Sequence, residues 1–306
     1  MKELALEIHT TAEVVADSAA EAARGGLPDY LELTKPRITF LILLTAAAGF
    51  CLGSRAGVDY LALAHAMVGI GLLSSGVSTL NQFMERDLDR LMRRTQARPL
   101  PAGRMAARNA FLFGASLTVG AELYLAVFVN LLTAALGLVV IAGYLFCYTP
   151  LKTRTSLSTV VGAIPGAMPP LMGWTAAAGS AGLEAWALFA ILFAWQFPHF
   201  LAIAWMYRED YARAGIVMLP VVEPDGRRTA QQIVVWTLLL VPVSLFPAML
   251  GTAGAVYLFG ALALGLLFIA SSVSAALSAS RQGARRLLLA SVLYLPVLFG
   301  LMVVNS

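Results

Sequence analysis

The sequence predicts an all-α polytopic membrane protein, with about nine transmembrane helices around a central cavity, arranged as two four-helix halves plus one helix. Hydrophobic residues make up 59% of the chain and charged residues only 12%, a balance typical of an integral membrane protein. Residues 229–280 contain no Asp, Glu, Lys or Arg. Only Glu184 interrupts the uncharged run between Arg154 and Arg208. Runs of this length must fold into several helices of about 20 residues each.

Glycine and proline clusters divide the apolar sequence into nine expected spans. In chain order these are residues 38–56, 60–82, 109–128, 131–149, 157–177, 184–206, 231–250, 254–277 and 287–304. Pro165, Pro169 and Pro170 interrupt helical hydrogen bonding in the fifth span. They predict either a wider cavity beside that span or an ordinary kink in its packing.

The basic residues predict how the spans are oriented, because cytoplasmic loops retain Lys and Arg during insertion. If nine spans alternate, 20 of the 21 basic residues lie on one side and Arg55 alone lies on the other. This asymmetry supports the count of nine. It predicts a multi-pass protein of a bacterial plasma (inner) membrane, with the N-terminus in the cytoplasm and the C-terminus outside.

Two regions are expected along the chain, a polar cytoplasmic N-terminal tail at 1–32 and a membrane domain at 33–306. The first 23 residues hold one Lys and five acids, unlike a signal or transit peptide. Within the membrane domain, one charged loop follows the second span and another follows the sixth. Because four spans separate these loops, they predict a parallel repeat of two halves.

The loop after the second span contains a candidate metal site. Asn81, Glu85 and Asp89 are spaced four residues apart, so on a continuing helix their side chains share one face. Carboxylate and amide oxygens of this kind can hold Mg²⁺. Arginines lie around them and could stabilise a diphosphate bridged by the metal. The alternative is an ordinary basic flank of a span, with acids that only solvate it.

Lys152 and Arg154 bring two more cations to the same side of the membrane, after Tyr148 at the end of the fourth span. They are either further ligands for a phosphate group or simple topological anchors.

Several separate segments together resemble the UbiA superfamily of intramembrane prenyltransferases, and within it the branch that makes heme O. The resemblance covers residues 33 to about 300. It rests on Thr34-Lys35-Pro36-Arg37, Asn81, Glu85, Asp89, Arg93-Arg94-Thr95, Arg98-Pro99-Leu100, Tyr148, Lys152, His199-Phe200 and Arg208-Glu209-Asp210-Tyr211. Two departures concern the metal ligands: Glu85 stands where many members have Asp, and the second motif offers Glu209-Asp210 instead of two aspartates four residues apart.

The resemblance implies transfer of the farnesyl group of farnesyl diphosphate to a vinyl group of heme b (protoheme IX). Addition of water then gives heme O for terminal oxidase biogenesis. The implied partners are farnesyl diphosphate, heme b and the lipid bilayer, and a downstream heme A synthase is a further candidate. No nucleic acid is expected.

The same resemblance implies the site residues. Mg²⁺ would be held by Asn81, Glu85, Asp89, Glu209 and Asp210. The catalytic group would be Asn81, Glu85, Asp89, Asp210 and Lys152. The residues expected to bind the diphosphate are Lys35, Arg37, Arg93, Arg94, Arg98, Lys152 and Arg154.

Two residues are expected to contact heme, His199 and Tyr148. His199 lies within the sixth span near its cytoplasmic half, where it could supply an axial ligand to the iron. The alternative is a polar residue that forms hydrogen bonds inside the bundle.

Two rival functions remain open from the sequence. A prenyltransferase of the same superfamily that acts on an aromatic or quinone precursor would use the same diphosphate site. A membrane heme carrier or transporter is the rival of another class. It predicts polar residues along the spans, which are nearly absent after residue 229.

Overall fold

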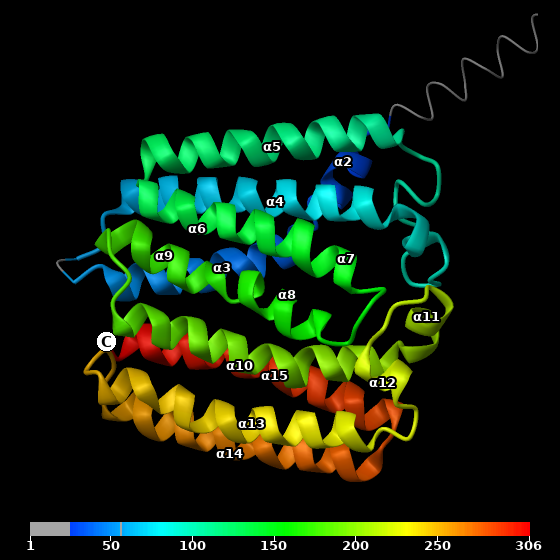
Figure 1. Cartoon of the computed structure of the whole chain (residues 1–306). Helices are drawn as coiled ribbons and strands as arrows, with labels where there is room; N and C mark the ends of the chain where they lie inside the picture. Colours follow the sequence, from blue (N-terminus) through cyan, green and yellow to red (C-terminus); the bar gives the residue numbers. More distant parts are fainter. Residues whose placement is uncertain (1–24, 56) are drawn as a thin grey trace, which may run out of the picture.

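The computed structural model describes residues 25–55 and 57–306, in which long helices run side by side and their ends gather in two sets of loops (Figure 1). Eight helical segments of this described part are long and apolar enough to cross a membrane. They are α3 (Pro36–Gly53), α4 (Tyr60–Arg90), α5 (Ala107–Phe128), the segment Leu131–Leu151, α10 (Leu183–Met206), α13 (Arg227–Met249), α14 (Ala255–Ser278) and α15 (Arg281–Val304). The expected all-α membrane architecture is therefore confirmed.

The segment Leu131–Leu151 is not a uniform α-helix. It consists of α6 (Leu131–Ile141), a π-helical stretch η1 (Ala142–Tyr148) and the single turn α7 (Thr149–Leu151). A π-helix has a wider turn than an α-helix and often marks a functional position. The end of this segment faces the charged loops (Figure 1).

The fifth expected span is divided into α8 (Ser158–Gly166) and α9 (Met168–Ala178). The break lies at Ala167, among the three prolines of this region. Gln196 of α10 is buried there and donates from Nε2 to the carbonyl of Ala163, 3.1 Å away. Because this span is two short helices, the expected count of nine spanning helices is not confirmed.

Short helices complete the described chain at the charged end: α2 (Leu27–Leu33), α11 (Arg208–Arg213) and α12 (Leu219–Val222). Arg104 of the α4–α5 loop forms ion pairs with Asp29 and Glu32 of α2, at 2.8 and 2.7 Å. The boundary expected after residue 32 therefore falls inside a helix that is tied to the membrane domain. Residues 1–24 of the expected tail lie outside the described residues.

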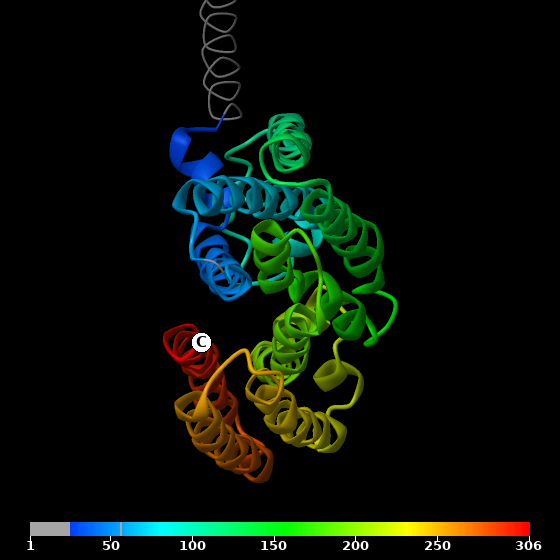
Figure 2. The same cartoon turned by 90° about the vertical axis from the view of Figure 1, so that its left-hand side faces the viewer.

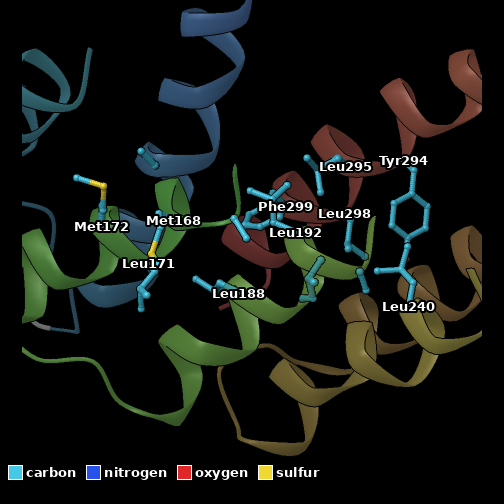
Figure 3. Packing of buried hydrophobic residues seen from close by; sticks show 14 of the residues in the cluster. Met168, Leu171, Met172, Leu188, Leu192, Leu240, Tyr294, Leu295, Leu298 and Phe299 are labelled. Carbon is cyan, nitrogen blue, oxygen red and sulfur yellow. The ribbon is translucent and has the colours of Figure 1, made fainter. Parts of the chain in front are cut away.

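The helices form two groups joined by the divided helix (Figure 2). One group is α3 to α6 and the other is α10 with α13 to α15, while α9 contacts α3, α4, α6 and α10. This arrangement agrees with the expected two halves. The buried side chains at the junction come from α9, α10, α13 and α15 (Figure 3).

The α3–α9 contact brings backbone against backbone, and two glycines make it possible. A Cβ on Gly49 would lie 2.0 Å from the carbonyl oxygen of Pro170. A Cβ on Gly173 would lie 1.8 Å from the carbonyl oxygen of Ala46. Small residues of this kind let helices approach closely in a membrane, where packing replaces the hydrophobic effect as the driving force.

Candidate active site

The site begins on α4, which continues well past its apolar part. Asp59 caps the start of this helix by accepting hydrogen bonds from the backbone N–H groups of Leu61 and Ala62. The helix then runs for 31 residues to Arg90. The continuing helix that the spacing predicts is therefore present.

Asn81, Glu85 and Asp89 are all buried on the inner face of this helix, at 2%, 7% and 1% exposure. Three polar side chains are costly to bury on one face unless each has a partner. Each of them has a basic partner from another part of the chain.

The partners of the α4 residues are two lysines and an arginine. Lys152 Nζ lies 2.6 Å from Glu85 Oε1, and Arg98 donates to Asp89 Oδ2 at 2.7 Å. Lys35 Nζ donates to Asn81 Oδ1 at 3.3 Å. The structure thus brings six of the expected site residues together at the charged end of the bundle.

Lys35 reaches this group because its backbone turns sharply before α3. It has a φ of 49° and a ψ of 60°, in the left-handed region that non-glycine residues seldom occupy. Such a conformation costs on the order of 1 kcal/mol and is often found at functional sites. Burial and the nearby guanidinium of Arg98 lower the pKa of Lys35 to about 8.

Lys152 contacts two groups at once. Its Nζ lies 4.5 Å from the centre of the Tyr148 ring, in addition to the Glu85 carboxylate. Burial lowers the pKa of Lys152, but Tyr148 and Glu85 raise it by more, so the pKa lies above the usual range for a lysine. The Tyr148 ring fits here because α8 has Gly162 against it, where a Cβ would lie 2.6 Å from the ring.

The two residues expected to supply metal ligands from the second half differ in burial and partners. Asp210 is buried in α11 and pairs with Arg213 of the same turn, whereas Glu209 is exposed. Within residues 25–55 and 57–306, no three His, Cys, Asp or Glu side chains form a group suited to a metal ion. Glu85, Asp89 and Asp210 are each paired with a basic side chain.

Arg94, which is expected to bind diphosphate, joins the two charged loops. Its guanidinium lies 5.2 Å from the ring centre of Tyr207 and 4.7 Å from that of Tyr211. It also donates to the Tyr211 hydroxyl at 2.7 Å. A separate bond joins the loop after α11 to the loop after α7, because the backbone N–H of Val217 donates to the carbonyl of Lys152 at 2.7 Å. Sequence reasoning missed these partners because nothing in the spacing relates residues so far apart.

The remaining expected phosphate ligands, Arg37, Arg93 and Arg154, are exposed at the same end of the molecule. They provide positive charge around the buried group without being part of it. The basic loops gather at this end in Figure 1, and the C-terminus lies at the other.

His199 lies inside α10, about 10 Å before its charged end. Its Nδ1 is 2.8 Å from the Ser291 hydroxyl of α15, and its ring stacks on Trp195 with 4.5 Å between centres. Because the Ser291 hydroxyl donates to the carbonyl of Leu288, its oxygen accepts a hydrogen bond from the Nδ1–H group of His199. This leaves the Nε2 lone pair of His199 available to a metal.

A cavity of about 510 Å³ opens at the opposite end of the bundle, and it is a different site. Phe50, Arg55, Trp174 and Glu184 are among its lining residues. Arg55 and Glu184 pair with each other at 2.6 Å, so their charges are already satisfied.

Comparison of the sequence with known proteins identifies the family of this chain. The model of the UbiA prenyltransferase family matches residues 42–299. A protoheme IX farnesyltransferase of Solibacter usitatus is 54% identical, over 90% of this chain and 98% of that protein. Another, from Koribacter versatilis, is 48% identical, over 91% of this chain and 93% of that protein.

Solved structures share the fold at much lower identity. A digeranylgeranylglyceryl phosphate synthase superposes with a TM-score of 0.77 at 17% identity, covering 91% of this chain and 98% of its own. A UbiA homologue from Archaeoglobus fulgidus bound to GPP and Mg²⁺ gives 0.63 at 18% identity, covering 90% of this chain and 99% of its own. Together with the sequence matches, these findings show that the chain is a member of the UbiA prenyltransferase family.

Proposed function

We propose that this prenyltransferase moves the farnesyl group of farnesyl diphosphate to a vinyl group of heme b and that water adds to give heme O. The observation that supports it most is the buried polar group on α4 at the end of an apolar bundle. It combines acidic oxygens with Lys35, Lys152 and Arg98. The two relatives at 54% and 48% identity are named as protoheme IX farnesyltransferases, which supports the acceptor.

Asn81, Glu85 and Asp89 are proposed to hold Mg²⁺, with Asp210 and Glu209 as ligands from the second half. Their oxygens are the donors that Mg²⁺ prefers. Glu85 fits this role, because its carboxylate is buried and the contact to Oε1 is the Lys152 ammonium, which a bound cation could replace. When bound, the metal would offset the negative charge of the diphosphate.

The basic residues have the complementary task. As the bond between C1 of farnesyl and the diphosphate oxygen breaks, negative charge grows on the leaving group. Lys152 and Arg98 can turn from the carboxylates to that charge, and Lys35 can turn from the Asn81 amide. Arg37, Arg93 and Arg154 add to the field around it. The vinyl carbon then supplies the electron pair to C1, water captures the cation beside the pyrrole, and a proton is released.

We propose His199 as the residue that holds the heme, with Tyr148 as a second contact. The bond from Nδ1 to Ser291 orients the ring and leaves Nε2 for the iron, the arrangement common among metal-binding histidines. Replacing His199 with Ala should alter the Soret band of the bound heme. His65, which pairs with the Tyr124 hydroxyl at the other end of the bundle, provides the control. An unchanged spectrum in the His199 variant would make it a packing residue.

The proposed orientation places the basic loops and N-terminus in the cytoplasm and the C-terminus outside, in a bacterial inner membrane. The gathering of basic loops at one end supports it. On this proposal the product would pass to a heme A synthase.

The test is to incubate the purified protein in detergent with heme b, farnesyl diphosphate and Mg²⁺, with and without EDTA, and to analyse the heme by mass spectrometry. A farnesylated and hydrated heme that needs Mg²⁺ is expected. Variants Asn81→Ala, Glu85→Ala and Asp210→Ala should abolish turnover. Asp87→Ala is the matched control, because that carboxylate on α4 is 70% exposed. Unmodified heme together with prenylation of a phenolic acceptor would refute the heme assignment.

A further inference from the structure

Thr149 is buried directly after the π-helical stretch and contacts Asn81, one of the three buried polar residues of α4. The proposed reaction gives Thr149 no role. Its exposure is 7%, and that of its neighbour Asn81 is 2%. Asn81 Nδ2 donates to Thr149 Oγ1 at 3.1 Å. Thr149 Oγ1 in turn donates to the carbonyl of Tyr144 at 2.9 Å.

The direction of these two hydrogen bonds is fixed by chemistry. A threonine hydroxyl has one proton, and here the Tyr144 carbonyl takes it, because a carbonyl can only accept. Thr149 Oγ1 can therefore only accept from Asn81, so the amide nitrogen must face it. On the other side, the ammonium group of Lys35 can only donate, so it must face Asn81 Oδ1. Both neighbours select the same orientation of the Asn81 amide.

The π-helical turn explains why Thr149 is in this place. The backbone N–H of Thr149 also donates to the Tyr144 carbonyl, five residues back, as a π-helix requires. The wider turn adds a residue, and one residue corresponds to about 100° around an α-helix. Residues after η1 are thereby rotated relative to a regular helix, which directs Thr149 toward α4.

We infer that Thr149 is a positioning residue that holds the Asn81 amide with Oδ1 turned toward the cation side of the site. The inference rests on the proposed function in one respect, that Asn81 Oδ1 is a metal ligand there. Without the hydroxyl, only the longer bond from Lys35 still selects this orientation, so the amide rotates more readily and presents its NH₂ group, which cannot bind a cation. Groups that orient a metal ligand typically change metal affinity by about 10-fold to 100-fold.

The test compares Thr149→Val, which keeps the shape and loses the hydroxyl, with Thr149→Ser, which keeps the hydroxyl. Mn²⁺ serves as the probe, and its binding to the full-length protein in detergent with farnesyl diphosphate is followed by EPR. We expect Thr149→Val to raise the Mn²⁺ concentration at half-saturation by about 10-fold. Thr149→Ser should remain within about 3-fold of the wild type.

The matched control is Thr237→Val. Thr237 is fully buried in α13 and has similar bonds, to the Ile233 carbonyl and the Ser272 hydroxyl. The Thr237→Val variant should leave Mn²⁺ binding unchanged. Unchanged binding in Thr149→Val, or equal weakening in the Ser variant, would overturn the inference, as would a wild type that binds no Mn²⁺ with the diphosphate. Because no acceptor is present, failure of the heme assignment would appear only in the product assay.

Discussion

Removing the positive charge of Lys152 should strongly destabilise the protein, because it leaves the Glu85 carboxylate buried without its counter-charge. The two groups are 2.6 Å apart, and their side chains are only 13% and 9% exposed. Breaking a buried pair of this kind costs about 3–5 kcal/mol. Because Lys35 lies nearby and some solvent reaches the pair, we expect Lys152→Met to lower the free energy of unfolding by about 3 kcal/mol.

A double-mutant cycle separates this charge effect from lost packing. Glu85→Gln removes the charge that Lys152→Met would strand, so the double variant should regain about 2 kcal/mol relative to the sum of the single variants. The assay is reversible unfolding in mixed micelles, followed by tryptophan fluorescence. All three variants should lose turnover, since both residues belong to the proposed catalytic group.

The control is the exposed ion pair between Arg228 and Glu223, which are 3.0 Å apart with side chains 76% and 21% exposed. Arg228→Met should change stability by less than about 1 kcal/mol. The reasoning is refuted if Lys152→Met is as harmless as this control, or if the effects of Lys152→Met and Glu85→Gln simply add.

The contacts of Lys35, Arg94 and Gly173 give four more predictions. Because the pKa of Lys35 is about 8, kcat/KM should fall as the pH rises through 8 and Lys35 loses its charge, and Lys35→Arg should remove this inflection. The pKa of Lys35 is lower in the folded protein than in the unfolded chain, so the free energy of unfolding should rise with pH from about 8 to about 10.5. Unfolding curves that show no such rise would contradict the lowered pKa of Lys35. Arg94→Lys keeps the charge but loses the planar stack on two tyrosines, so it should weaken the link between loops by about 1 kcal/mol and raise the KM for farnesyl diphosphate. Arg90→Lys is the matched control, because that side chain is 58% exposed and has no proposed role in the site. Equal KM values in the two variants would refute the link. Gly173→Ala should force α3 and α9 apart and lower the free energy of unfolding by about a few kcal/mol. The control is Gly120→Ala, which has open space around it and should leave the free energy of unfolding unchanged or raise it. Equal effects of the two variants would mean that the α3–α9 contact is not tight.

The features predicted best from the sequence are those that depend on local pattern. Charge-free runs identify the spanning helices, and the four-residue spacing of Asn81, Glu85 and Asp89 places them on one face before any fold is known. The gathering of basic loops at one end also follows from counting Lys and Arg. These signals depend on neighbours in the chain.

What could not be predicted depends on partners far apart in the chain. The prolines of residues 157–177 signal an interruption, but the division at Ala167 and the bond from Gln196 of α10 to the Ala163 carbonyl appear only in the fold. The stack of Arg94 on Tyr207 and Tyr211 joins residues more than a hundred positions apart. The orientation of Asn81 depends on a π-helical turn that the expected span 131–149 did not reveal.

The length of α4 has a consequence for how a lipid-like substrate would reach the site. From Tyr60 to Asn81 the helix rises about 32 Å, close to the roughly 30 Å thickness of a bilayer's hydrocarbon core. The polar face thus begins about where hydrocarbon ends, and Asp89 lies about 12 Å further along. A fifteen-carbon donor could keep its tail in an apolar medium while its phosphates meet the charged residues. Extracting that tail into water would cost about 12 kcal/mol at 0.8 kcal/mol per carbon, a barrier that a reaction centre at the phase boundary avoids.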